Sequence, residues 1–125
     1  MNYQTMLNII PTLQELVSAK LPLKASYALF TLAKEVNTQK DFFVDEERKL
    51  IEKYNATVTP RGQISFGDKV EDRKGFLRDY AELNGMEVSL NTQLPIVIKM
   101  EDVNGTDLKV SAADLMALSG IVDFE

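Results

Sequence analysis

One stretch constrains the fold more than any other, because Leu23–Tyr54 contains neither glycine nor proline. Four apolar residues recur in it at intervals of seven: Leu29, Val36, Phe43 and Leu50. This spacing returns side chains to one helical face, so we predict a single long amphipathic helix. Such a helix would be about 48 Å long, against a radius of gyration of ~14 Å for a compact domain of this size. We therefore expect it to overhang the body, bend, or lie against a partner.

The composition is that of a soluble globular protein with one domain, residues 1–125: 45% apolar and 26% charged. The net charge is −5, and no basic run exceeds two residues, so we expect no nucleic-acid partner. No run of 18 apolar residues is present, and the N-terminal residues lack the pattern of a signal peptide. We therefore expect no membrane association and a cytoplasmic location.

The chain has neither cysteine nor histidine, which excludes thiolate nucleophiles and removes the commonest general base and the commonest transition-metal ligand. We expect a protein that is not an enzyme, with no catalytic residues, no cofactor and no metal site. The acidic residues at 41 and 45–47 alternate with basic residues at 48, 49 and 53. This pattern is typical of a solvated helix face carrying i,i+4 ion pairs rather than of a metal site.

Before the long helix, apolar residues at 3, 6, 7, 10, 13 and 17 follow helical spacing. Pro11 interrupts this pattern, and proline damages a helix interior. We therefore predict a first helix that begins near Asn8, its cap, with residues 2–6 extended as an edge strand. Pro22 follows as the first residue of the long helix, after a tight corner.

After the long helix the period changes to two. Thr57–Thr59 and Gln63–Phe66 flank Pro60-Arg61-Gly62, a turn sequence, so we predict a β-hairpin. The next helix carries apolar residues from Val70 to Leu83, capped by Asp68 or Asp72, and stops at Asn84-Gly85. Two helices joined by a β tip pack as an antiparallel hairpin. Gly75 inside the second helix costs about 1 kcal/mol relative to alanine, which indicates either close packing on another helix or a helix that starts further along the chain.

The last third combines strand and helix patterns. Met86–Leu90 and Pro95–Met100 are predicted strands, and Asn104-Gly105 a turn. Ser111 and Asp114 resemble a capping box for a short helix, Ala112–Leu118, and Ile121–Phe124 is a predicted final strand. The predicted fold class is α+β and mainly helical: a long helical hairpin with a β-hairpin tip and a small C-terminal β/α segment.

Three segments resemble a family of small, largely uncharacterised bacteriophage proteins of about this length. The segments are Lys20–Tyr27 (KLPLKASY), Glu46–Tyr54 (EERKLIEKY) and the ending Leu108–Leu118. The shared order is a short helix, a Leu-Pro break and a long charged helix. The resemblance implies a phage origin, hence a location in the host bacterial cytoplasm or in the virion. It brings no catalytic residues.

Three functions follow as hypotheses. The first is a non-enzymatic protein that binds a host or viral protein, in particular as an antagonist of a host defence protein. The second is a head, neck or tail component of the virion, or an assembly accessory protein, for which heptad spacing favours a homo-oligomer. The candidate protein contacts are Phe42, Phe43, Val44, Arg61, Phe30 and Tyr54, since Phe42–Val44 covers three sides of a helix that one partner helix cannot bury.

The third hypothesis is a small-ligand binder, for example one that sequesters a nucleotide signal. Its basic residues and stacking ring would be Lys69, Arg73, Lys74, Arg78 and Tyr80. Acidic residues at 71, 72 and 79 alternate with these and leave the local charge near balance. The same residues therefore also fit an ordinary solvated helix face.

Overall fold

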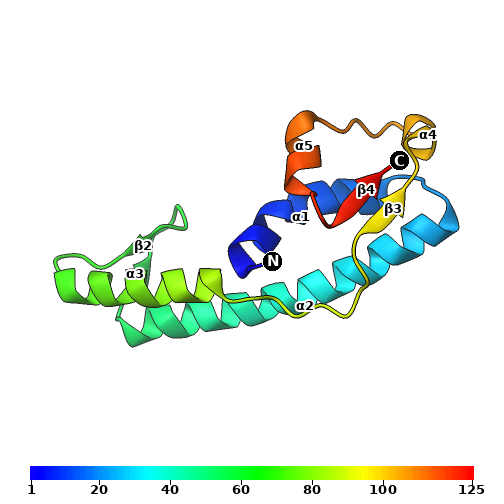
Figure 1. Ribbon diagram of the computed structural model, residues 1–125. Helices are drawn as coiled ribbons and strands as arrows, with labels where there is room; N and C mark the ends of the chain where they lie inside the picture. The colour runs from blue at the N-terminus through cyan, green and yellow to red at the C-terminus, as the bar shows by residue number, and fades with distance from the viewer.

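The fold is organised along one helix that runs nearly the length of the molecule (Figure 1). A computed structural model describes residues 1–125 and confirms a mainly helical α+β fold. The helices are α1 (Tyr3–Ser18), α2 (Leu23–Lys53), α3 (Val70–Gly85), α4 (Met100–Asn104) and α5 (Ala112–Ala117). The strands are β1 (Thr57–Val58), β2 (Ile64–Ser65), β3 (Ile96–Ile98) and β4 (Val122–Phe124).

Helix α2 confirms the predicted long helix, with 31 residues and a length of about 46 Å. Its N-terminal half packs under α1 and β3, whereas its C-terminal half extends past them and pairs with α3 (Figure 1). Three of the heptad positions are buried: Leu29, Val36 and Phe43. The heptad stripe therefore belongs to the core of this chain, and a coiled coil with a second copy along the same stripe is not available.

Helix α1 corrects the prediction that a helix begins near Asn8. It begins at Tyr3, and the Asn2 side chain caps it by accepting a hydrogen bond from the Thr5 N–H. Pro11 lies inside the helix with its ring facing solvent. Its buried neighbours lie on both sides of the proline: Tyr3, Met6, Ile9, Leu13 and Leu16. Burial of that continuous stripe outweighs the one backbone hydrogen bond that the proline removes.

The helical hairpin with its β tip is confirmed. Strands β1 and β2 pair antiparallel, with Thr57 opposite Ser65, and α3 returns along the C-terminal half of α2 (Figure 1). The N-cap of α3 is Lys69, not Asp68 or Asp72, and its side chain makes no capping bond. The acidic residues of the first turn, Glu71 and Asp72, instead lie where the helix dipole favours negative charge.

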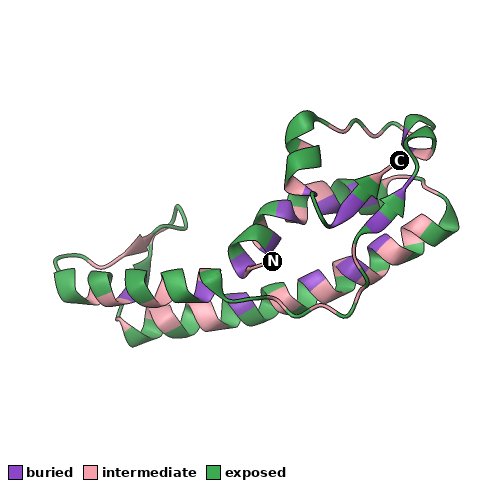
Figure 2. Ribbon diagram, in the orientation of Figure 1, coloured by how far each residue is buried: buried purple, intermediate pink, exposed green.

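A chain of aromatic rings connects the main core to the β tip. Tyr3 of α1 lies 5.8 Å from Phe43, and Phe43 lies 6.0 Å from Tyr80 of α3. Tyr80 stacks on Phe76 at 5.3 Å, and Phe76 continues to Phe66 beside β2 at 5.2 Å. These rings give the projecting end of the molecule an apolar interior, although it contains few fully buried residues (Figure 2).

The C-terminal part forms a second small sheet, in which β3 and β4 pair in parallel with Ile96 opposite Val122. Two short helices lie in the connection, and the first, α4, was not predicted. The capping box of α5 is confirmed, because Ser111 and Asp114 each accept the other's backbone N–H. The predicted strand Met86–Leu90 is wrong: only Glu87 forms a bridge, to Asn2.

The segment between α3 and β3 is bonded at its start to the backbone of residues 1–3 and further along to a side chain of α2. The Glu35 carboxylate accepts hydrogen bonds from the Thr92 hydroxyl and the Asn91 N–H, which hold the pKa of Glu35 below its ordinary value.

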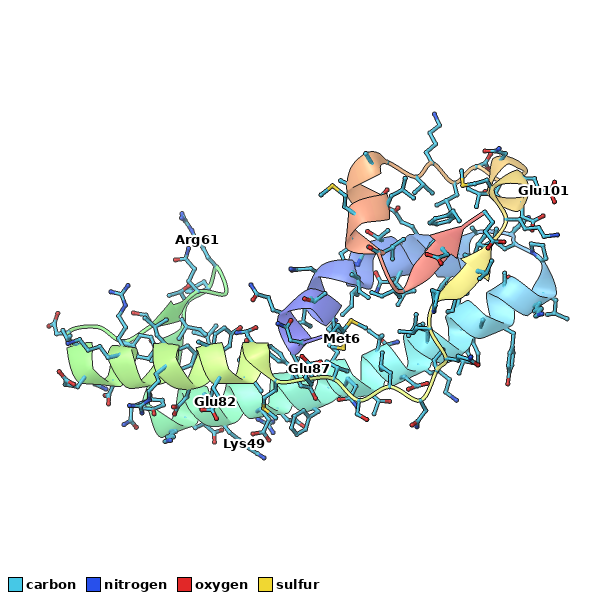
Figure 3. The ribbon with its side chains drawn as sticks, viewed as in Figure 1. Met6, Lys49, Arg61, Glu82, Glu87 and Glu101 are labelled. Carbon is cyan, nitrogen blue, oxygen red and sulfur yellow. The ribbon has the colours of Figure 1, made fainter.

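None of the helices combines the length and apolar character of a membrane-spanning segment. Met6 marks the centre of the core, between α1 and α2 (Figure 3).

Candidate protein-binding surface

The N-terminal half of α2 carries an exposed apolar stripe on the side that faces away from the core. Leu23, Tyr27 and Phe30, here called the outer stripe, are 85%, 68% and 52% exposed. Their spacing of four and three residues places them on one helical face. The buried residues of the same half, Leu29 and Leu32, lie on the opposite face. No part of the chain covers the outer stripe.

The outer stripe is ordered by contacts among its own side chains. The Tyr27 and Phe30 ring centroids are 6.5 Å apart in a tilted arrangement. One turn further, the Lys34 ammonium lies 5.6 Å from the centre of the Phe30 ring. An aromatic pair with a cation over one of its rings is thus presented to solvent.

Hollows flank α2 on both sides of this stripe. One of about 360 Å³ lies between α1 and α2 and is lined by apolar residues that include Ile10, Val17 and Ala33. The other, of about 830 Å³, lies between α2 and the segment Gln93–Asp102. The N-terminal half of α2 therefore lines two of the hollows on the surface of the protein.

The cluster Phe42–Val44 does not form the surface expected of it. Phe43 is buried between Tyr3 and Tyr80, so as a protein contact it is corrected to a core residue. Phe42 and Val44 are 42% and 48% exposed. Because two positions on a helix differ by about 200°, these two side chains point in nearly opposite directions. They cannot contribute to one patch.

The other predicted contacts are spread over the molecule. Phe30 belongs to the outer stripe, whereas Arg61 lies at the tip between β1 and β2 and points away from the body (Figure 3). Tyr54 is half-buried at the end of α2, where its hydroxyl donates to Asp79 of α3. It therefore connects the two helices of the hairpin and does not project as a free contact.

The residues proposed for a nucleotide-signal site do not converge either. Lys69 and Arg73 are exposed, and Lys74 and Arg78 pair with their own neighbours, Lys74 to Glu71 at 3.9 Å and Arg78 to Asp79 at 3.3 Å. A hollow of about 460 Å³ beside the β tip includes only Arg73 of this set.

Tyr80 has its ring face occupied. It stacks on Phe76 with an interplanar angle of 15°, and its hydroxyl donates to Glu47 Oε2 at 2.7 Å. Burial, together with the Glu47 carboxylate, raises the pKa of Tyr80 to about 12. This ring is a packing element between α2 and α3 and has no open face for a base to stack on.

Asp79 is the most perturbed carboxylate of the chain. The Tyr54 hydroxyl, the Lys53 ammonium at 3.2 Å and the Arg78 guanidinium all donate to it. These donors lower its pKa to about 2. Since the donors come from both helices of the hairpin, Asp79 acts as a structural clamp. No group of three or more acidic side chains is close enough to hold a metal ion.

Sequence reasoning missed Leu23 and Tyr27 as surface residues. The signal was present, because positions 23, 27 and 30 follow helical spacing out of phase with the buried positions 29 and 36.

The chain was also compared with known proteins. No protein-family model, no curated protein and no solved structure matches it.

Proposed function

We propose that this protein acts without catalysis, by binding another protein through the outer stripe. The observation that carries the proposal is the exposure of Leu23, Tyr27 and Phe30 on the face of α2 opposite the core. Contiguous exposed apolar side chains of this size mark interaction sites more often than scattered single ones. Aromatic residues are also enriched among the residues that dominate binding energy in protein interfaces.

The kind of partner follows from the resemblance to small phage proteins. That resemblance supports a phage-encoded chain that works in the cytoplasm of a bacterial host. We propose that the partner is a host protein, and in particular a defence protein that the chain antagonises. The net charge of −5 supports a protein partner over nucleic acid.

A pair of substitutions that introduce negative charge into the outer stripe tests the proposal. The full chain is expressed in a bacterial host and captured with its bound proteins, as wild type and as the double variant Tyr27→Glu, Phe30→Glu. A control, Leu77→Glu, places one such charge on an apolar side chain of α3 that is 52% exposed. We expect one protein to be retained by wild type and by the control but lost from the double variant.

Affinity measured on the purified pair makes the test quantitative. Truncation of residues that dominate an interface costs 2 kcal/mol or more, so the double variant is expected to weaken binding by at least about 30-fold. Undiminished binding by a correctly folded double variant would exclude the outer stripe. The identity of the partner then separates a host target from a virion component.

The alternative of a virion or assembly protein depends on self-association. Because the heptad positions Leu29, Val36 and Phe43 lie in the core, a homo-oligomer would have to use another surface. The outer stripe is the most apolar one available. Light scattering on the wild type and on the Tyr27→Glu, Phe30→Glu variant decides this: an oligomer that becomes a monomer favours the alternative, and a monomer in both disfavours it.

A further inference from the structure

Strand β3 has one edge that is paired and one that is open. On the paired edge, the Ile96 N–H donates to the Ile121 carbonyl at 2.9 Å and the Ile98 carbonyl accepts from the Glu125 N–H at 2.9 Å. Residues 96 and 98 therefore direct their backbone groups towards β4. Since alternate residues of a strand direct these groups to opposite edges, Val97 directs its N–H and C=O away from β4.

The open edge carries a short row of unpaired backbone groups. The sheet has only two strands, so no strand lies beside Val97 on that side. The Pro95 carbonyl and the Lys99 N–H, which share the phase of Val97, have no hydrogen-bond partner in the chain. Two acceptors and two donors are thus presented in the alternation that a neighbouring strand would satisfy.

The open edge faces a groove. β3 lies between β4 and the N-terminal half of α2 (Figure 1). The hollow of about 830 Å³ is bounded on one side by Gln93–Asp102 and on the other by α2 residues that include Ala25 and Ala28. Ala25 and Ala28 are part of the α2 wall of the hollow, and Val97 is 50% exposed. The groove therefore combines unpaired backbone groups with an apolar wall.

We propose that this groove binds an extended peptide segment of a partner protein, which adds to β3 as a third strand. Its backbone would pair with Pro95, Val97 and Lys99, and its side chains on one face would pack against Ala25 and Ala28. Peptide addition to an exposed sheet edge uses main-chain hydrogen bonds for affinity and the flanking pockets for specificity. A third strand would also complete a sheet that is otherwise small for independent stability.

The ends of the groove limit what the segment can be. Pro95 has no N–H to donate, and α4 begins at Met100, so pairing extends over about three to five residues of the partner. Lys24 and Lys99 lie along the groove with Glu101 and Asp102, so both charges are present at its rim. An apolar segment flanked by mixed charges fits this lining better than a uniformly charged one.

The proposal goes beyond the outer stripe and is tested without it. A random library of linear twelve-residue peptides is panned on the full chain carrying Tyr27→Glu and Phe30→Glu. Enriched peptides are then bound to the same protein, and amide hydrogen exchange is followed by NMR. We expect the Val97 and Lys99 amides to exchange at least tenfold more slowly in the complex. The Ile96 amide, already bonded to Ile121, should change little.

Substitutions on each side of the groove provide the second test. Val97→Pro removes the central donor, with Val97→Thr as the control that keeps it. Ala28→Phe fills the groove from the α2 side and decides the matter if Val97→Pro does not fold. We expect Val97→Pro and Ala28→Phe each to weaken peptide binding at least tenfold. Failure to enrich any peptide, or peptides that bind without slowing exchange at Val97 and Lys99, would overturn the proposal.

Discussion

Gly75 offers a test in which a substitution that favours helix should destabilise the protein. A Cβ added at Gly75 would lie 2.5 Å from Cε1 and 3.0 Å from Cζ of Tyr54. The Tyr54 ring cannot move aside freely, because its hydroxyl is bonded to Asp79 and its edge packs on Phe76 at 6.4 Å and 88°. Gly75→Ala must therefore displace this ring.

The opposing free energies can be compared. Alanine gains about 1 kcal/mol over glycine within a helix. Displacing the ring loses an aromatic pair, about 0.5–1.5 kcal/mol, and forces an unfavourable rotamer, about 0.5–1.5 kcal/mol, in addition to the hydrogen bond to Asp79. The losses exceed the gain, so we expect Gly75→Ala to lower the free energy of unfolding by about 1 kcal/mol. With Tyr54→Ala already in place, the same substitution should raise it by about 1 kcal/mol.

A double-mutant cycle between positions 54 and 75 measures the coupling. Urea unfolding is followed by circular dichroism for the wild type, both single variants and the double variant. The expected coupling between positions 54 and 75 is about 2 kcal/mol, with a change of sign between the two backgrounds. If Gly75→Ala stabilises both backgrounds by the same amount, the close packing between Tyr54 and α3 is refuted.

Three further predictions test the core, the clamp and a cap. Leu29→Ala, at a fully buried position, should cost about 2–5 kcal/mol in urea unfolding, whereas Leu23→Ala should change stability by no more than about 0.5 kcal/mol; similar costs would contradict the orientation of α2. The folded-state pKa of Asp79, about 2, lies below the ordinary value of 3.8. The Asp79 carboxylate therefore contributes its full stabilisation above about pH 4 and loses it as pH falls towards 2. Asp79→Asn should make the free energy of unfolding less dependent on pH in that range. An unchanged pH profile would count against the clamp. Ser111→Ala should cost about 0.5–2 kcal/mol in α5, measured by amide exchange against Ser119→Ala, and equal exchange in the two variants would show that the cap contributes nothing.

The helical hairpin was predictable because its signals are local. A long stretch without glycine or proline, a turn at Pro60-Arg61-Gly62 and an Asn84-Gly85 ending each determine structure from neighbouring residues alone. The same is true of the capping box at Ser111 and Asp114, whose partners are three residues apart. Gly75 was predictable only in part: the cost of a helical glycine allowed either a close neighbour or a later helix start, and the structure shows a close neighbour, Tyr54, inside a helix that begins at Val70.

Elements that depend on distant contacts were not predictable in this way. Pro11 lies inside α1 because the helix buries apolar residues on both sides of the proline against α2. The local sequence shows the apolar spacing but not the partner helix that makes this burial possible. Met86–Leu90 alternates like a strand but pairs only at one bridge, between Glu87 and Asn2, and Glu35 holds the segment that follows it. In both places tertiary packing outweighs local preference.

The exposure of apolar residues on α2 also depends on contacts that are distant in the sequence. Helical spacing divides the apolar residues of α2 into faces, but which face is covered depends on where α1, β3 and α3 lie. Phe43 and Leu23 are comparably apolar, yet Phe43 fills the space between Tyr3 and Tyr80 while Leu23 is 85% exposed. The packing of α1, β3 and α3 on α2 therefore leaves the outer stripe, and not Phe42–Val44, as the candidate surface.

The fold itself does not require the outer stripe. Helix α2 is held by Leu29, Leu32 and Val36, which are at most 1% exposed, and polar residues at 23, 27 and 30 would leave that packing intact. Exposed aromatic side chains in water add nothing to stability and favour aggregation. Lysine or glutamate at positions 27 and 30 would stabilise the helix equally well, so the packing of the fold does not explain Tyr27 and Phe30. Binding of another protein by the outer face of α2 is the explanation that we propose and the first function to test.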